Sequence, residues 1–215
     1  MKFQYSPAAL TGPVDMPSQV TARVAKKPLR LDDEVQFIRS WIEKPLRTGA
    51  VMPSSKALAR TMARHVDRAS DGPVIELGPG TGPVTAALVE RGIDPSRLVL
   101  VEFNSDFCRL LRKRYPEATV VQGDAYRLRH LIESKLEQPA AAIVSSLPLL
   151  TKPLRSRLRL MADVVGLMQP KAPFIQFTYG LVPPIPKTLS SISAEASNLI
   201  WLNLPPARVW VYRGR

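Results

Sequence analysis

The chain has 215 residues, of which 45% are hydrophobic, and this suits one globular domain with an additional segment. Its 30 Lys and Arg residues against 18 Asp and Glu residues give a formal net charge of +12, which favours an anionic partner, either a nucleic acid or a membrane surface. The lone cysteine, Cys108, excludes an internal disulfide, and we interpret it as a buried thiol of a cytoplasmic protein. His65 and His130 have no ligand spacing with it, so we expect no metal site.

The first 30 residues carry no periodic apolar pattern, and we expect residues 1–30 to form a mobile segment. Pro7, Pro13 and Pro17 interrupt the apolar run that a signal peptide would need. The longest apolar stretch, residues 140–150, is too short for a transmembrane helix. Any membrane contact is therefore expected to be peripheral.

Residues 31–47 have the pattern of an amphipathic helix. Apolar side chains recur at helical spacing with two aromatic residues beside them: Leu31, Val35, Ile38, Ile42, Leu46, Phe37 and Trp41. Two interpretations stay open, because such a helix either packs on the protein core or lies in a membrane interface. In the second case the membrane-binding residues are Phe37, Ile38 and Trp41, with Lys26, Lys27 and Arg30 attracting anionic lipids.

Strands and helices alternate along the remainder of the chain, after a helix predicted over residues 55–68. The strands are predicted at 74–77, 98–102, 119–122, 141–146 and 173–178, and the helices at 83–91, 105–115, 126–137 and 153–168. This alternation predicts an α/β fold with a doubly wound, mostly parallel sheet. We expect a loop at 180–198 and a closing hairpin at 199–203 and 207–213, which brings the sheet to seven strands. The amphipathic helices at 31–70 thus precede a domain at 71–215.

A glycine-rich turn follows the first of these strands. Residues 74–82 read Val-Ile-Glu-Leu-Gly-Pro-Gly-Thr-Gly, and the next residue is Pro83, which is favoured at the first position of a helix. Gly78, Gly80 and Gly82 allow a tight turn and a close approach of the backbone to a ligand. The pattern indicates a strand, a ligand-binding loop and a helix.

Two acidic residues restrict the class of ligand that this loop can bind. Glu102 ends the next predicted strand and follows Gly82 by 20 residues, where an acid accepts hydrogen bonds from both hydroxyls of a ribose. Glu76 precedes the glycine loop, where it would repel a phosphate and suit a cation. This combination argues against a dinucleotide.

These motifs, together with Gly123-Asp124-Ala125 after the third strand, resemble the class I S-adenosylmethionine-dependent methyltransferases, which have a Rossmann-like sheet. The resemblance implies that Glu76 lies near the methionine amino group, Glu102 binds the ribose and Asp124 contacts the adenine. The cofactor-binding residues that it implies are Glu76, Gly78, Gly80, Gly82, Glu102, Phe103, Asp124, Ala125 and Ser145. Ser54 and Ser55 either contact the methionine end of the cofactor or only cap the helix that follows them.

The fourth strand ends in Ser145-Ser146-Leu147-Pro148-Leu149, at the place that faces the methyl group in this class. The ribosomal RNA adenine dimethyltransferases carry Asn-(Leu/Ile)-Pro-(Tyr/Phe) there, with the Asn on the exocyclic amine of adenine and the aromatic ring stacked on the flipped base. Here Ser146 and Leu149 occupy these two places. These two differences argue against RNA adenine N6-methylation, which we keep as the alternative function. We expect no nucleic acid as a partner.

The Ser-Ser-Leu-Pro loop, the segment from Phe37 to Ser55 and the positive charge together resemble the bacterial phospholipid N-methyltransferases. This resemblance implies successive methylation of phosphatidylethanolamine to phosphatidylcholine, with S-adenosylmethionine as cofactor. It also implies a peripheral enzyme on the inner face of the cytoplasmic membrane, whose partners are the phospholipid substrate and an anionic membrane surface. No obligate protein partner is evident.

Methylation of a primary amine needs the neutral amine, and burial favours that form. The 145–149 loop offers no His or carboxylate as a base, so Ser145 and Ser146 would act by positioning the substrate. Tyr179, after strand 173–178, would take the proton or hold a methylated ammonium by cation–π contact, or it only covers the sheet edge. Lys152 would pair with the lipid phosphate or remain solvated.

Overall fold

The computed structural model describes residues 55–179, 182–186, 192–203 and 205–214. The mobile segment predicted at 1–30, the amphipathic helix predicted at 31–47 with all its membrane-binding candidates, and Ser54 lie outside these residues.

Seven strands form one sheet in the order β3-β2-β1-β4-β5-β7-β6. Their bounds are β1 Val74–Leu77, β2 Leu98–Glu102, β3 Thr119–Gln122, β4 Ala142–Ser145, β5 Phe174–Thr178, β6 Ile192–Ala196 and β7 Arg208–Gly214. Strands β1 to β5 pair in parallel with one another, whereas β7 is antiparallel to both β5 and β6. The carboxyl ends of the five parallel strands therefore meet at one edge, and the strand order reverses beside β1, where doubly wound folds bind their ligands.

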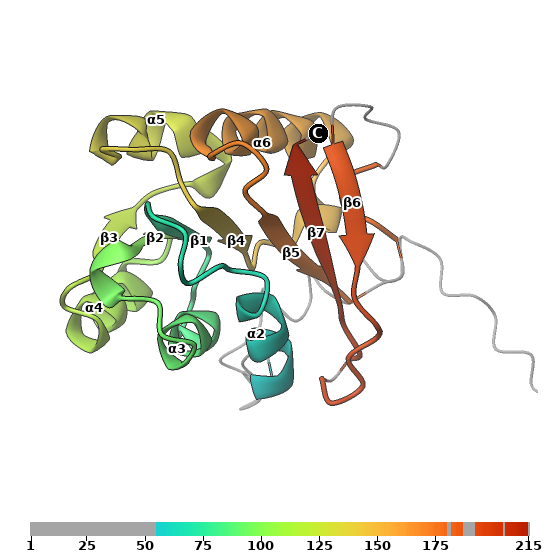
Figure 1. Ribbon diagram of the computed structural model, residues 1–215, viewed down its shortest axis with the longest axis horizontal. Coiled ribbons are helices and arrows are strands. Elements are labelled where there is room, and N and C mark those ends of the chain that lie inside the picture. Colours follow the sequence, from blue (N-terminus) through green and yellow to red (C-terminus); the bar gives the residue numbers. More distant parts are fainter. Residues whose placement is uncertain (1–54, 180–181, 187–191, 204, 215) are drawn as a thin grey trace, which may run out of the picture.

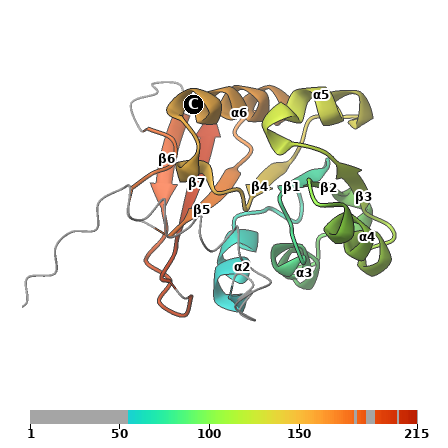
Figure 2. The ribbon, with the colours of Figure 1, turned by 180° about the vertical axis from the view of Figure 1, so that it is seen from behind.

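Helices cover both faces of this sheet (Figures 1 and 2). One face carries α2 (Lys56–Ala63), α3 (Pro83–Glu90) and α4 (Ser105–Arg114), and the other carries α5 (Leu128–Ile132) and α6 (Leu154–Leu167). Because successive side chains of a strand point to opposite faces, Val74 joins the first apolar cluster and Ile75 joins the second. Strands β1, β2 and β4 are thus buried on both sides, as their mainly apolar runs require.

Helix α2 is part of the first cluster, because Leu58 and Met62 are fully buried there. Ser55 caps the helix: its Oγ accepts a hydrogen bond from the Leu58 N–H at 3.2 Å. The Ser55 N–H donates to Asn203 Oδ1 at 2.9 Å, which joins the start of α2 to the loop before β7. Cys108 is buried on α4, as predicted.

The helix predicted over 126–137 is wrong in its extent. In its place lie a 3-10 turn at Ala125–Arg127, the short helix α5 and a second 3-10 turn at Glu133–Lys135. The Asp124 side chain accepts a hydrogen bond from the Tyr126 N–H at 3.0 Å, and this local bond favours the tight first turn over an α-helix.

The end of the chain also differs from the prediction. The expected loop at 180–198 contains β6, and the strand expected at 199–203 is instead the turn of the β6–β7 hairpin, with one isolated bridge between Ile200 and Ala207. β6 lies at the sheet edge, and its residues are half-buried or exposed. An edge strand of this composition has no apolar run, so periodicity does not identify it.

Candidate functional site

The glycine-rich loop after β1 has the conformation that its glycines permit. Gly78, Gly80 and Gly82 have φ angles of 68°, 57° and 84°, in the left-handed region where a side chain would be strained. A Cβ atom on Gly80 would meet no other atom within 4 Å, so the loop borders open space at this point. A Cβ on Gly78 would instead lie 3.1 Å from the Leu147 side chain, which brings the loop against the segment after β4.

Glu102 fastens this loop to the end of β2. Its Oε2 accepts a hydrogen bond from the Gly80 N–H at 2.9 Å, and its Oε1 accepts one from the Asn104 N–H at 2.8 Å. The residue is 7% exposed, at the carboxyl edge of the sheet. Because each carboxylate oxygen can accept a further hydrogen bond, Glu102 is able to receive two neighbouring hydroxyl groups, as a ribose would present them.

Glu76 lies within β1 and is fully buried. Its Oε2 accepts a hydrogen bond from the Thr85 hydroxyl at 2.7 Å, whereas its Oε1 has no partner among the described residues. Burial raises the pKa of this carboxyl from 4.5 to about 7; the Thr85 hydrogen bonds oppose the rise and the charge of Glu102 adds to it. A cation bound beside the loop would favour the ionised form, so the site suits a ligand with an ammonium group. Thr85 was not predicted from the sequence.

A shallow hollow lies beyond Glu102, between the ends of β2 and β3. It is lined by Phe103, Asn104, Ser105, Gln122 and Gly123. The Phe103 ring is 76% exposed, so its face is free for a planar ring to stack on. Asp124 is exposed beside this hollow, and Ala125 is buried.

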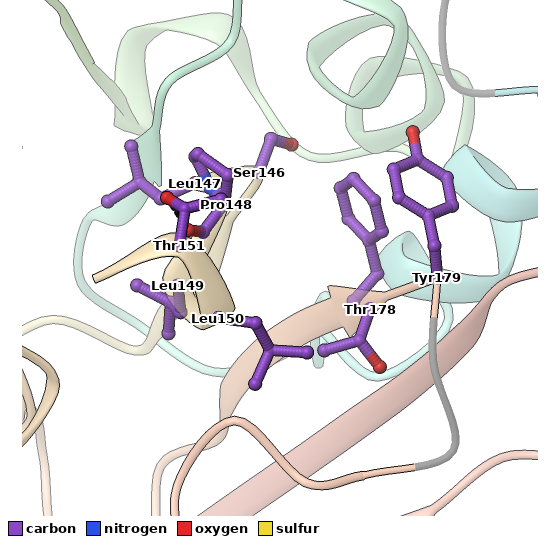
Figure 3. Close-up of a pocket in the computed structure, with 9 residues that line it drawn as sticks. Ser146, Leu147, Pro148, Leu149, Leu150, Thr151, Thr178 and Tyr179 are labelled. Atoms are coloured by element: carbon purple, nitrogen blue, oxygen red, sulfur yellow. Dashed lines mark hydrogen bonds between the residues drawn. The ribbon is translucent and has the colours of Figure 1, made fainter. Parts of the chain in front are cut away.

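A second cavity lies on the other side of the glycine loop, with a volume of about 110 Å³. Figure 3 shows the segment after β4 on one side of it and the end of β5 on the other. The lining residues are Ser146, Leu147, Pro148, Leu149, Leu150, Thr151, Phe177, Thr178 and Tyr179. None of them is a carboxylate, an imidazole or a basic residue, so the cavity desolvates a substrate but offers it no strong base.

Hydrogen bonds fix the segment after β4. The buried Gln176 donates from Nε2 to the Leu147 carbonyl at 2.9 Å, and the Ser146 N–H donates to the Leu77 carbonyl at 2.9 Å. Ser145 is fully buried, and its Oγ accepts from the Leu147 N–H at 3.3 Å. Of the two serines, Ser146 therefore lines the cavity, and Ser145 shapes its wall. Gln176 was not identified from the sequence.

Two aromatic residues close the cavity at β5. The Tyr179 ring packs edge-on against Phe177, with their centroids 5.2 Å apart. Burial raises the pKa of the Tyr179 hydroxyl, so the phenol stays neutral, and this favours cation–π contact over proton uptake. Phe177 belongs to the site but was not predicted. Lys152 does not line the cavity; its Nζ lies 5.1 Å from the centre of the Tyr126 ring.

Comparison with known proteins agrees with this geometry. Residues 54–154 match the family described as Ribosomal RNA adenine dimethylase. The chain is 28% identical over 189 residues to an Ornithine lipid N-methyltransferase from Singulisphaera acidiphila, an alignment that covers 86% of this chain and 97% of that protein. It is 34% identical over 97 residues to a Ribosomal RNA small subunit methyltransferase A from Synechococcus, which covers 43% of this chain and 31% of that protein. An O-methyltransferase from Bacillus cereus, solved in complex with SAH, has the same fold, with a TM-score of 0.56 at 14% identity over 89% of this chain and 94% of that one.

The protein is a S-adenosylmethionine-dependent methyltransferase. The residues at the strand ends fit this cofactor, because Glu102 has free acceptor capacity for a ribose, Gly80 borders open space and Glu76 has a buried oxygen without a described partner. Phe103 lines the hollow beyond Glu102, and Asp124 directly follows Gly123 of that lining. The methyl group would then face the cavity between Ser146 and Tyr179.

The raised pKa of Glu76 predicts pH-dependent cofactor binding. Below about pH 7 the carboxyl is mostly protonated in the free protein, and binding a cationic amino group beside it must first remove that proton. Affinity for S-adenosylmethionine should therefore rise by up to about tenfold per pH unit between roughly pH 5.5 and 7, and then level off. Calorimetry across this range measures the slope.

Glu76→Gln should abolish this pH dependence and weaken binding at about pH 7.5, because the amide cannot ionise. Glu117→Gln, which changes an exposed carboxyl, is the control and should keep the slope. Equal slopes for the Glu76 variant and the parent protein would show that Glu76 does not face the cofactor's charge.

Proposed function

We propose that this methyltransferase N-methylates the headgroup amine of a membrane lipid, with phosphatidylethanolamine and its mono- and dimethyl derivatives as substrates and phosphatidylcholine as the product. The observation that carries the proposal is the cavity between Ser146 and Tyr179. It is small, mainly apolar and without a strong base, and two aromatic rings border it. Such a cavity suits an amine that is made nucleophilic by desolvation.

When bound, S-adenosylmethionine supplies a methyl group on a sulfonium: the amine lone pair forms the new N–C bond while the S–C bond breaks and the thioether departs. The protein's part is to hold the neutral amine in line with that bond and to exclude water. The proton that the amine loses goes to solvent, since no lining residue accepts it readily. The rings of Phe177 and Tyr179 are then available to the methylated ammonium by cation–π contact.

The relatives support a lipid more than an RNA. The alignment with the lipid N-methyltransferase covers 97% of that protein, whereas the alignment with the ribosomal RNA enzyme covers 31% of its length. RNA adenine methylation remains the second candidate, favoured by the family match over 54–154 and by the net charge of +12. Against it, Leu149 occupies the place of the stacking aromatic residue and is 2% exposed.

Action at the inner face of the cytoplasmic membrane is part of the proposal. Among the residues that the structure describes, no helix is long and apolar enough to cross a bilayer. The turn of the β6–β7 hairpin carries two exposed apolar side chains, Trp201 at 75% and Leu202 at 83% exposure. Because Arg208 at the start of β7 pairs with Thr178 at the end of β5, this turn projects from the same sheet edge as the cavity. Tryptophan and leucine at this edge suit a membrane interface.

The choice between lipid and RNA is tested by label transfer. The protein is incubated with S-adenosylmethionine labelled in the methyl group and either liposomes that contain phosphatidylethanolamine or ribosomal RNA, and the label is followed by phase extraction. We expect the label in the lipid phase, in an amount that increases with the phosphatidylethanolamine content. Label in the RNA and none in lipid would overturn the proposal.

The hairpin turn is tested by liposome sedimentation of the variant Trp201→Ser with Leu202→Ser. Each lost apolar contact with the bilayer weakens binding, by about 0.8 kcal/mol per buried methylene, so the variant should sediment markedly less. Val165→Ser is the control: Val165 is 44% exposed near the end of α6, and the Leu167 carbonyl accepts from the Ala140 N–H just before β4, at the opposite sheet edge. Equal sedimentation of all three proteins would mean that another surface, such as the one predicted at Phe37 and Trp41, holds the membrane.

A further inference from the structure

A cleft of about 500 Å³ lies between the 3-10 turn after β3 and the start of α6. It is lined by Asp124, Tyr126, Arg127, Arg155, Ser156 and Arg159. Among the described residues, none of the three arginines forms an ion pair or a side-chain hydrogen bond. The one acid of the lining, Asp124, accepts a hydrogen bond from the Tyr126 N–H with its Oδ1. The cleft therefore has an excess of positive charge.

The charges at the start of α6 oppose the helix dipole. The N-cap residue is Pro153, which makes no side-chain hydrogen bond, and the first turn holds no acid but does hold Arg155. A helix N-terminus carries a partial positive charge, so basic residues there destabilise the helix unless an anion is nearby. Helix α4 has the ordinary arrangement, with Asp106 in its first turn and basic residues in its last. The first turn of α6 therefore adds positive charge to the cleft, where an anion would stabilise the helix.

One short segment borders both the cleft and the apolar cavity. Thr151 lines the cavity, Pro153 starts α6, and between them the Lys152 Nζ lies over the Tyr126 ring, which lines the cleft. The Tyr126 hydroxyl is buried and has no hydrogen-bond partner among the described residues. A ligand that spans this segment would place one group in the apolar cavity and another among the arginines.

We propose that the cleft binds the anionic group of a zwitterionic aminolipid headgroup whose amine occupies the cavity. The inference rests on the proposed function and adds to it the feature by which the substrate is recognised. The anion is a phosphate in phosphatidylethanolamine and a carboxylate in an ornithine lipid, and guanidinium groups bind both in forked hydrogen bonds. Lys152 lies at the edge of the cleft and adds to its positive charge.

The cleft also bears on the chemistry at the amine. In a free zwitterionic headgroup the anion stabilises the neighbouring ammonium, because an opposite charge favours the charged form. When the arginines pair with the anion, this stabilisation is lost and the positive field of the cleft further disfavours the ammonium. The pKa of the amine falls, and more of it is the neutral nucleophile. The arginines thereby increase the fraction of neutral amine without accepting the proton, which still goes to solvent.

The test compares the variant Arg155→Gln with Arg159→Gln against a control with the same loss of charge, Arg109→Gln with Lys113→Gln. The control residues are exposed on α4, which covers the other face of the sheet. The substrates are short-chain phosphatidylethanolamine, short-chain ornithine lipid and an alkylamine that has no anion. Binding of each to the parent protein and to both variants, loaded with S-adenosylhomocysteine, is also measured by calorimetry, with inorganic phosphate as a competitor.

We expect the cleft variant to raise KM for a zwitterionic lipid by roughly tenfold per arginine removed and to shift its rate profile to higher pH. The alkylamine should be methylated equally by all variants. The size of the effect on phosphatidylethanolamine relative to the ornithine lipid shows whether phosphate or carboxylate is preferred. Competition by inorganic phosphate that is lost in the cleft variant would also support an anion site.

An unchanged KM and pH profile for both lipids in the cleft variant would overturn the inference while leaving lipid methylation intact. If the parent protein methylates no lipid, the proposed function fails; lipid binding that depends on the two arginines would then still support the cleft, and no such binding would overturn it as well. Tight binding of an oligoribonucleotide in the cleft, with no lipid binding, would assign the arginines to RNA and also overturn it.

Discussion

The carboxylate of Glu102 holds together the two strand ends on which the cofactor site is built. By accepting from both Gly80 and Asn104, it ties the loop after β1 to the start of the segment after β2. The glycine loop is thereby kept in its left-handed conformation, with open space beside Gly80. The same loop contacts Leu147 through the position of Gly78, so the cofactor side and the substrate side of the site share one support.

The substrate side is arranged by buried polar contacts around an apolar hollow. Gln176 reaches from β5 to the Leu147 carbonyl and fixes the wall that faces Phe177 and Tyr179. A reaction that begins with a charged sulfonium and a neutral amine needs desolvation and alignment more than a strong base. The lining of this described cavity holds no carboxylate, imidazole or basic side chain, which agrees with such a reaction.

The sequence predicted the parallel strands and the three acids because their signals are local. The central parallel strands are continuous, mainly apolar runs: Glu76 lies within β1 and Glu102 ends β2. Asp124 follows the end of β3 by two residues, in the turn that opens after Gly123. Strand β6 was not predicted, since its Ile-Ser-Ala-Glu-Ala sequence has no apolar run and becomes a strand only by pairing with β7. Strand pairing depends on residues that are far apart in the sequence, and the apolar periodicity of a single segment does not reveal it.

Several residues of the site were not predicted because their roles also depend on contacts between distant parts of the chain. Thr85 and Gln176 are ordinary polar residues in the sequence, and their roles depend on the distances to Glu76 and Leu147 in the folded protein. Arg127 is likewise far in the sequence from Arg155 and Arg159, and the three line one cleft only after α6 has packed beside the turn at Ala125. For Tyr179 the sequence left proton uptake, cation–π contact and a purely structural role open, and its burial, which raises the pKa of the hydroxyl, argues against proton uptake.

The most direct test of this account is the affinity of Glu102→Ala for S-adenosylmethionine, measured by calorimetry beside Glu117→Ala, which removes an exposed carboxyl. The account predicts a loss on the order of 1–3 kcal/mol for Glu102→Ala, because both ribose hydroxyls lose their acceptor and the Gly80 and Asn104 N–H groups lose theirs. The control should bind as the parent protein does. Parent-like affinity in Glu102→Ala would contradict the placement of the cofactor at this strand end, and with it the account of the site.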